Sequence, residues 1–186
     1  GNVSCLGPRA CYDESKRLSE TLCYIYNDKF ELPINIVRPF NNYGPGLHIN
    51  DGRVIADFFK NILENQDIEI FSDGTSTRTF CYISDAITGY LLALLSKDKG
   101  EVYNIGNDAP EISMINLANL IIDISNSKSK VVYKTNEDKH YLTNNPQRRC
   151  PDITKAKSKL NFSPNISLEE GLAYTHNYYS DQKNEN

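Results

Sequence analysis

The most regular pattern of apolar and polar positions in the chain lies in residues 12–30. Leu18, Leu22, Ile25 and Tyr26 recur there at helical spacing, with no Gly or Pro between them. Because side chains three or four residues apart share one face of a helix, we predict an amphipathic helix for this segment. A proline on each side of it marks the helix boundaries.

Shorter apolar segments alternate along the rest of the chain. We predict strands at residues 34–37, 68–71, 79–83, 102–105 and 131–133, and helices at residues 53–65, 85–95, 114–124, 153–160 and 168–179. Ser84 and Ser113 are suited to cap two of the helices, and Arg38-Pro39 is expected to end the first strand. Residues 39–52, rich in Gly, Pro and Asn, are predicted to form a loop outside the core.

This alternation of helix and strand predicts an α/β fold. A doubly wound α/β domain opens with a strand and a glycine-rich turn, whereas this chain opens with a loop and a helix. We therefore expect only the later part of such a fold. The chain also starts at Gly1 and has Met114 as its only methionine, which favours the loss of an upstream portion.

Composition excludes several classes of protein. The net charge of -4 argues against a nucleic-acid-binding surface, which needs clustered Lys and Arg. The longest apolar run, residues 90–95, is far shorter than the roughly 18 residues of a membrane span. We therefore predict neither a nucleic-acid partner nor a membrane segment in this chain.

The cysteines and histidines predict no metal site. The five cysteines contain no C-x-x-C pair, and His48, His140 and His176 are scattered. We expect reduced, mostly buried thiols, which favour a reducing compartment and a cytoplasmic location.

Tyr12 and Lys16 are the first candidates for chemistry. They lie four residues apart on the first helix, so their side chains project from the same face. An ammonium close to a phenol stabilises the phenolate, which can take a proton from a hydroxyl group and return it. The spacing alone is also compatible with an exposed tyrosine beside a solvated lysine.

The sequence around this pair resembles the UDP-glucuronate decarboxylases, also called UDP-xylose synthases, of the extended short-chain dehydrogenase/reductase superfamily. The resemblance rests on blocks that occur in family order over nearly the whole chain. They are G-P-R-A-C-Y-D-E-S-K-R (7–17), R-P-F-N-N-Y-G-P (38–45), N-D-G-R-V (50–54), D-G and T-R-T-F (73–80), N-I-G-N (104–107), P-Q-R-R and P-D-I (146–153) and L-E-E-G-L (168–172).

The resemblance implies a C-terminal part of a Rossmann-like doubly wound sheet plus a smaller α/β substrate-binding domain. Residues 1–45 and about 80–107 would belong to the remnant of the NAD-binding domain. Residues from about 46 to 79 and 108–180 would form the nucleotide-sugar-binding domain, and residues 181–186 a disordered tail. The resemblance further implies a homodimer that forms through the helix of Tyr12 and Lys16 when the protein is full length.

The resemblance also assigns roles at the catalytic end of the site. Tyr12 would be the acid/base at the sugar C4 hydroxyl, and Lys16 would bind the nicotinamide ribose of NAD. Pro39 and Asn42 would lie near the nicotinamide. Asn41 would donate to phosphate or sugar oxygens, although a loop asparagine also commonly bonds its own backbone.

Arg53, Arg78 and Arg148 match family positions that hold the nucleotide diphosphate. Guanidinium groups suit this role because they pair bidentately with phosphate oxygens. Phe71 would stack on the uracil or lie in the core, and Tyr26 would approach the substrate from the active-site helix.

The reaction implied is oxidation of UDP-glucuronate at C4 by NAD, loss of CO2 from the resulting 4-keto acid, and return of the hydride to give UDP-xylose. The N-N-Y-G-P block also resembles dTDP-glucose 4,6-dehydratases, so a dehydratase or a UDP-sugar 4-epimerase remains an alternative. A non-catalytic module that binds nucleotide sugars is a third. The glycine-rich loop, the acidic residue for the adenosine ribose and the upstream Ser/Thr and Glu of the family are absent, so we expect this chain alone to be inactive.

Overall fold

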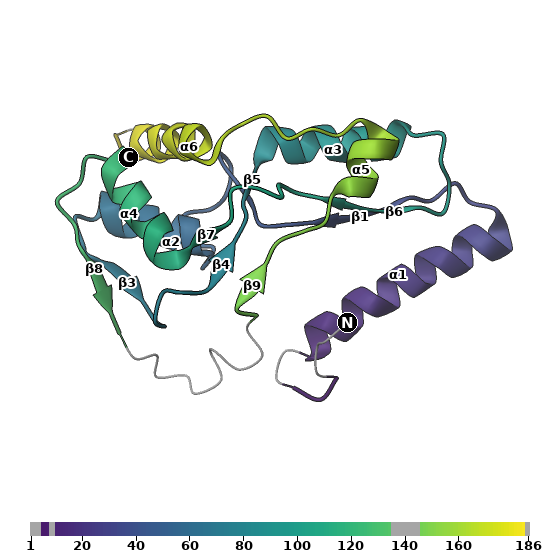
Figure 1. Cartoon of the computed structure of the whole chain (residues 1–186), viewed down its shortest axis with the longest axis horizontal. Helices are drawn as coiled ribbons and strands as arrows, with labels where there is room; N and C mark the ends of the chain where they lie inside the picture. Colours follow the sequence, from purple (N-terminus) through teal and green to yellow (C-terminus); the bar gives the residue numbers. More distant parts are fainter. Residues whose placement is uncertain (1–4, 8–9, 135–145, 185–186) are drawn as a thin grey trace.

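The computed structural model describes residues 5–7, 10–134 and 146–184 as a mixed α/β chain (Figure 1). The helices are α1 (Ala10–Phe30), α2 (Val54–Leu63), α3 (Ile83–Leu95), α4 (Met114–Ile124), α5 (Thr154–Leu160) and α6 (Leu168–Asn184). The strands are β1 (Ile36–Pro39), β2 (Asn42–Tyr43), β3 (Ile68–Ile70), β4 (Thr77–Arg78), β5 (Cys81–Tyr82), β6 (Val102–Ile105), β7 (Ile112–Ser113), β8 (Val131–Tyr133) and β9 (Arg148–Arg149). The alternation predicted from the sequence is confirmed.

Parallel pairing dominates, as the α/β class predicts. The pairs β1–β6, β2–β5 and β3–β8 are parallel, and β4 is the middle strand of the three-stranded sheet β7-β4-β9. The strand predicted at residues 79–83 is only partly right, because the segment contains the two-residue strand β5 and then the first residue of α3. The chain changes sheets just before β5: β4 pairs with β7 and β9, whereas β5 pairs with β2.

Strand β1 continues through Pro39, although we expected it to end before Arg38. The backbone amides of Ile36 and Phe40 donate to carbonyls of the β6 segment at 2.8 and 3.0 Å. Successive amides of a strand point to opposite sides. At residue 39 the amide position therefore points away from β6, and no N–H is needed there. Proline is tolerated there for that reason.

Helices α3 and α5 cover one face of the β1–β6 pair (Figure 1). Tyr103 and Ile105 alternate toward them and are fully buried with Ala156 and Phe162. Gly89 allows α3 to approach β6 closely, since a Cβ there would lie 2.5 Å from Ile105 Cγ2. Helix α5 therefore packs with the β1–β6 unit, although the sequence suggested that it belongs to the second unit.

A second core lies between α2, α4, α6 and β3. Its fully or almost fully buried members include Ile55, Phe59, Leu117, Ile121 and Leu172. Each helix contributes positions three or four residues apart, as the amphipathic pattern predicts.

The predicted loop of residues 39–52 enters this core at one point. Tyr43 is only 3% exposed, and its hydroxyl donates to the carbonyl of Leu168 at 3.2 Å. The expectation that this segment lies wholly outside the core is therefore wrong, because a tyrosine can bury its ring when its hydroxyl has a partner.

Only one of the two predicted helix caps is confirmed. Ser113 caps α4, since its side chain accepts from the amide of Asn116. Ser84 is not a cap, because α3 begins one residue earlier, at Ile83, with Tyr82 in the capping position. Helix α6 reaches Asn184, so residues 181–184 are helical where we expected a disordered tail.

All five cysteines are free, which agrees with reduced thiols, but the expected burial is wrong for most of them. Only Cys81 is buried, and Cys5 and Cys11 are exposed. In the part of the chain that the structure describes, no helix has the length and apolar character to cross a membrane.

Candidate active site

A cavity of about 1330 Å³ brings together most of the residues that the sequence singled out. It is lined by α1, β1, β2, α2, β3, β4 and β9, and Figure 1 shows these elements following one another from the start of α1 past β9 and β4 to β3. Seven of the ten predicted site residues line it: Tyr12, Pro39, Asn41, Asn42, Arg53, Phe71 and Arg78.

Tyr12 lies in the first turn of α1, at the edge of the cavity, with 58% of its surface exposed. The ammonium of Lys16 stands 5.5 Å from the centroid of the Tyr12 ring. The helix therefore brings the pair together as the four-residue spacing predicts. A hydroxyl group of a bound ligand can reach Tyr12 from the cavity.

Two neighbouring asparagines follow β1. Asn41 has a positive φ of 42°, and its Nδ2 donates to the carbonyl of Thr79 at 2.7 Å. The side chain thus bonds the segment between β4 and β5 rather than its own backbone, and its second N–H remains available. Asn42 donates to the hydroxyl of Tyr90, and its buried Oδ1 has no partner among the described residues.

Arg78 is the most buried cation of the cavity, with 8% of its surface exposed. Its guanidinium donates to the carbonyls of Thr77 and Pro146, both at 2.7 Å, and of Gln147 at 3.2 Å. These carbonyls fix the orientation of the guanidinium in the wall of the cavity.

Arg53 is the exposed residue just before α2, and its Nε lies 2.7 Å from Oδ2 of Asp51. Exposed ion pairs of this kind are weak, so an entering anion can compete with Asp51 for the guanidinium. The geometry is compatible with a second phosphate ligand next to the N-terminus of α2, where free backbone amides also favour an anion.

At β9 the cavity wall contains Arg149 rather than Arg148. Arg148 points elsewhere, and its Nε donates to both carboxylate oxygens of Glu111 at 2.9 Å. Hydrogen bonding to Glu111 raises the pKa of Arg148, while Thr77 and then Arg148 lower the pKa of Glu111. Arg149 is half-buried and lines the cavity. Side chains alternate along a strand, so only one of the two neighbours can face inward.

Phe71 lines the cavity, and Tyr26 does not. Phe71 is half-buried after β3 and lines the cavity, as a stacking role requires. Tyr26 is exposed outside the cavity, and its ring centroid lies 5.3 Å from that of Phe30. It follows Tyr12 by fourteen residues, or about 21 Å along a helix, which is too far to share a sugar.

Sequence reasoning missed Asp57, an acidic residue on the cavity side of α2. Desolvation raises the pKa of its carboxyl group, Lys60 opposes that shift, and Asp51 adds to it. The helical spacing from Arg53 to Asp57 was the available signal, since residues four apart share a face.

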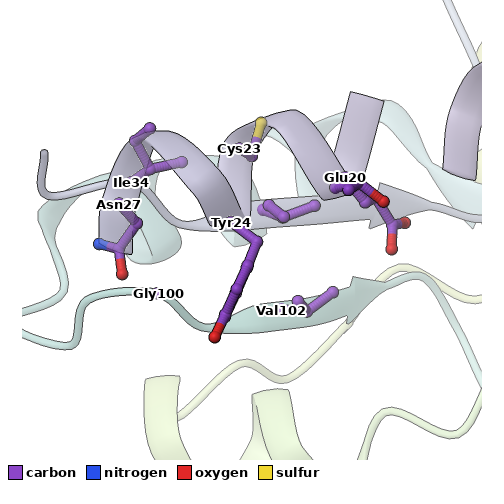
Figure 2. A pocket seen from close by; sticks show the side chains of 9 residues that line it. Glu20, Cys23, Tyr24, Asn27, Ile34, Gly100 and Val102 are labelled. Carbon is purple, nitrogen blue, oxygen red and sulfur yellow. The ribbon is translucent and has the colours of Figure 1, made fainter. Parts of the chain in front are cut away.

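A second, smaller cavity of about 280 Å³ lies between α1 and the β1–β6 pair. Figure 2 shows Tyr24 extending from α1 toward β6, with Val102 beside it. The side chains that line it form no acid/base pair and no cluster of cations. In the described residues no three His, Cys, Asp or Glu side chains lie close enough to hold a metal ion, and His140 lies outside those residues.

Comparison with known proteins places this arrangement in a family. Residues 2–106 match the NAD dependent epimerase/dehydratase family. UDP-glucuronic acid decarboxylase 1 of Xenopus tropicalis is 38% identical over 179 residues, which are 96% of this chain and 41% of that protein. The chain therefore spans less than half of this relative's length.

Solved structures show the same relationship. UDP-glucuronic acid 4-epimerase from Bacillus cereus, in complex with UDP-glucuronic acid and NAD, has a TM-score of 0.78 and 33% identity over 88% of this chain and 50% of that one. The dTDP-glucose 4,6-dehydratase from Streptomyces venezuelae, with NAD bound, has a TM-score of 0.82 and 26% identity over 93% of this chain and 52% of that one. The α/β fold, the cavity with its Tyr–Lys pair and these matches together show that the chain belongs to the NAD dependent epimerase/dehydratase family.

Proposed function

We propose that this chain forms the nucleotide-sugar-binding part of an NAD-dependent decarboxylase that converts UDP-glucuronate to UDP-xylose through a 4-keto sugar. One observation carries the proposal: a single cavity joins Tyr12 to the cations Arg53, Arg78 and Arg149. A proton acceptor at one end and a cradle for a diphosphate beyond it match the two ends of a sugar nucleotide. The sequence similarity to decarboxylases selects the substrate.

The cavity suggests how the substrate lies. The diphosphate is held between Arg78, already oriented by three carbonyls, and the half-buried Arg149. Arg53 approaches it from the start of α2. The uracil lies toward Phe71, and the sugar lies toward Asn41 and Tyr12. This orientation places the sugar C4 hydroxyl, rather than the phosphate, at the phenol.

In this arrangement Tyr12 takes the proton of the C4 hydroxyl and later returns it. Lys16 holds its ammonium 5.5 Å from the centroid of the Tyr12 ring, so a positive charge lies beside the phenol. Asn41 donates its second amide hydrogen to the substrate. NAD, when bound, supplies a hydride acceptor for C4 that later returns the hydride.

The described residues fit the nicotinamide end of NAD only. Lys16, which lies beside Tyr12 but does not itself line the cavity, offers donors for the ribose, and Pro39 and Asn42 line the cavity. The buried, unpartnered Oδ1 of Asn42 suits an N–H donor such as a carboxamide. The sequence has no G-x-G-x-x-G run to hold the pyrophosphate. We therefore propose that other residues, outside this chain, provide that part of the cofactor site.

A 4-epimerase is the second candidate, because the Bacillus cereus structure is an epimerase in complex with UDP-glucuronic acid. Epimerases and 4,6-dehydratases share the proton transfer at C4, so the cavity alone does not separate them. A non-catalytic binding module is the third candidate, and Tyr12 and Lys16 argue against it, since binding alone requires neither.

Product analysis tests the proposal. A longer protein that contains this chain would be incubated with NAD and UDP-glucuronate labelled at C6, and the products followed by NMR. We expect labelled CO2 and UDP-xylose, both lost in Tyr12→Phe. A C4 epimer that retains the label would indicate the epimerase, and turnover of dTDP-glucose alone would indicate the dehydratase. Binding without turnover would support the module.

A further inference from the structure

The proposed diphosphate cradle carries as many negative as positive side chains. Among the described residues that line the cavity, four are cations, namely Arg53, Lys60, Arg78 and Arg149. Four are carboxylates, namely Asp57, Glu64, Glu69 and Asp73. A dianionic diphosphate therefore enters a cavity without net positive charge, and at least one carboxylate must oppose its binding.

Of the four carboxylates that line the cavity, Asp57 is nearest in the chain to a proposed phosphate ligand. Its backbone amide donates to the carbonyl of Arg53 at 2.9 Å, so the two residues are one helical turn apart. Side chains at this spacing lie on the same face, with Cβ atoms about 5–6 Å apart. Both line the cavity, so a phosphate held by Arg53 lies near the carboxylate of Asp57.

The other three carboxylates are differently placed. Asp73 accepts hydrogen bonds from the amide and hydroxyl of Thr75 at 2.9 and 2.7 Å. Glu69 is paired with Lys134. Glu64 is the C-cap residue of α2, at the opposite end of the helix from Arg53. Among the described residues none makes a hydrogen bond or ion pair with the carboxylate of Asp57, which lines the cavity.

We propose that Asp57 limits the affinity of this cavity for a diphosphate, and that binding of a nucleotide sugar is coupled to uptake of a proton by Asp57. The inference rests on the proposed function, because it takes the diphosphate of a nucleotide sugar as the ligand. The protonated carboxyl group no longer repels the phosphate and can donate a hydrogen bond to it.

The charged groups around Asp57 come from several elements. Asp51 and Arg53 precede α2, and Lys60 follows on the same helix. Arg78 of β4 and Arg149 of β9 share the cavity with it. Helix α6 packs on α2 from the other side, and its Lys183 donates to the carbonyl of Leu63 at the far end of α2. These groups leave Asp57 with both attractive and repulsive neighbours.

The direction of the pH dependence follows from the free and bound states. Asp57 is exposed at the cavity, yet desolvation of its carboxyl group there already raises its pKa; a bound dianion raises that pKa further, because it opposes the charged form. The complex therefore holds more protons than the free chain around the pKa of Asp57. Affinity rises as the pH falls through that range and levels off above it.

Calorimetry with UDP-xylose tests this inference, since its diphosphate has no terminal phosphate that titrates near neutral pH. Titrations from about pH 5 to about pH 8, in buffers of different ionisation enthalpy, report affinity and proton uptake together. The variants are Asp57→Asn, Glu64→Gln at the other end of α2, and Asp123→Asn, an exposed residue outside the cavity.

We expect Asp57→Asn to bind UDP-xylose severalfold more tightly near neutral pH, without proton uptake and with a flatter pH profile. Glu64→Gln and Asp123→Asn should keep the wild-type pH profile and proton uptake. Unchanged affinity and proton uptake in Asp57→Asn would overturn the inference. An equal gain of affinity for UDP-xylose in Asp123→Asn would also overturn it, because it would indicate a general charge effect. Failure of the wild-type chain to bind UDP-xylose at any pH would instead overturn the proposed function.

Discussion

Arg38 donates two hydrogen bonds to the carboxylate of Glu20, one of them from Nε at 2.6 Å, and this ion pair links α1 to β1. No residue of α1 is buried, although the helix carries Tyr12 and Lys16. The position of Tyr12 and Lys16 therefore depends on a small number of contacts of this kind.

We predict that Glu20→Gln destabilises the chain near neutral pH and not in acid. The hydrogen bond from Arg38 lowers the pKa of Glu20 below its ordinary value of 4.5. The stabilisation is thus present above pH 4.5 and is lost as the pH falls through the lowered pKa. The side chains are 49% and 31% exposed, so we expect no more than about 1 kcal/mol in thermal unfolding.

Glu14→Gln is the matched control, because Glu14 pairs with Arg17 on the same helix at 3.3 Å and does not reach β1. Glu14→Gln should have a smaller effect on stability than Glu20→Gln near neutral pH. An equal loss of stability in both variants, or a loss in Glu20→Gln that persists in acid, would refute the role of the Arg38 pair.

Tyr12→Phe should abolish proton transfer at C4 and leave substrate binding in place. The ring remains at the edge of the cavity, and the arginines proposed to hold the diphosphate are untouched. Loss of a positioned acid/base lowers turnover by about 10²–10⁴-fold. Steady-state rates of a longer active protein and calorimetry on the chain measure the two effects separately. Tyr26→Phe, outside the cavity, should change neither, and a loss of turnover there would contradict our placement of the site.

Arg149→Ala should weaken the binding of UDP, whereas Arg148→Ala should not. Removal of Arg149 takes a cation from the cavity and should weaken UDP binding by about tenfold. Removal of Arg148 breaks only its pair with Glu111 and should leave the affinity unchanged. Calorimetry with UDP distinguishes the two variants. A larger loss of affinity in Arg148→Ala than in Arg149→Ala would show that Arg148, and not Arg149, faces the ligand.

Gly89→Ala should destabilise the β1–β6 unit. The added Cβ would lie 2.5 Å from Ile105 and 3.0 Å from Phe162, both of which are fully buried. Overpacking of this kind costs about 1–3 kcal/mol. Thermal unfolding measures it, with Ile87→Ala on the exposed side of α3 as the control. A stability equal to wild type would show that α3 can move away from β6 at no cost.

Local features of the site were predictable from the sequence, and non-local ones were not. Tyr12 and Lys16 meet because a helix fixes their spacing within five residues. Which of Arg148 and Arg149 faces the cavity depends on how β9 pairs with β4, whose residues Thr77 and Arg78 lie far away in sequence. The prediction for Tyr26 is unsupported because the length of α1 separates it from Tyr12.

In the fold, too, local features were predictable from the sequence and non-local ones were not. Helices α1, α2 and α4 were predictable because apolar periodicity and capping act within one segment. The break between β4 and β5 was not, because the two strands join different sheets and each needs a distant partner. Asp57 was missed for a related reason, since its importance depends on the cations that other strands bring to the cavity.

Calorimetric titration of the chain with UDP-glucuronate, and separately with NAD, tests the central claim most directly. The cavity with its three arginines should bind one UDP-glucuronate, and Arg149→Ala should weaken that binding. NAD should bind weakly or not at all, because the chain has no glycine-rich turn for its pyrophosphate. Tight binding of NAD without measurable binding of UDP-glucuronate would contradict the account.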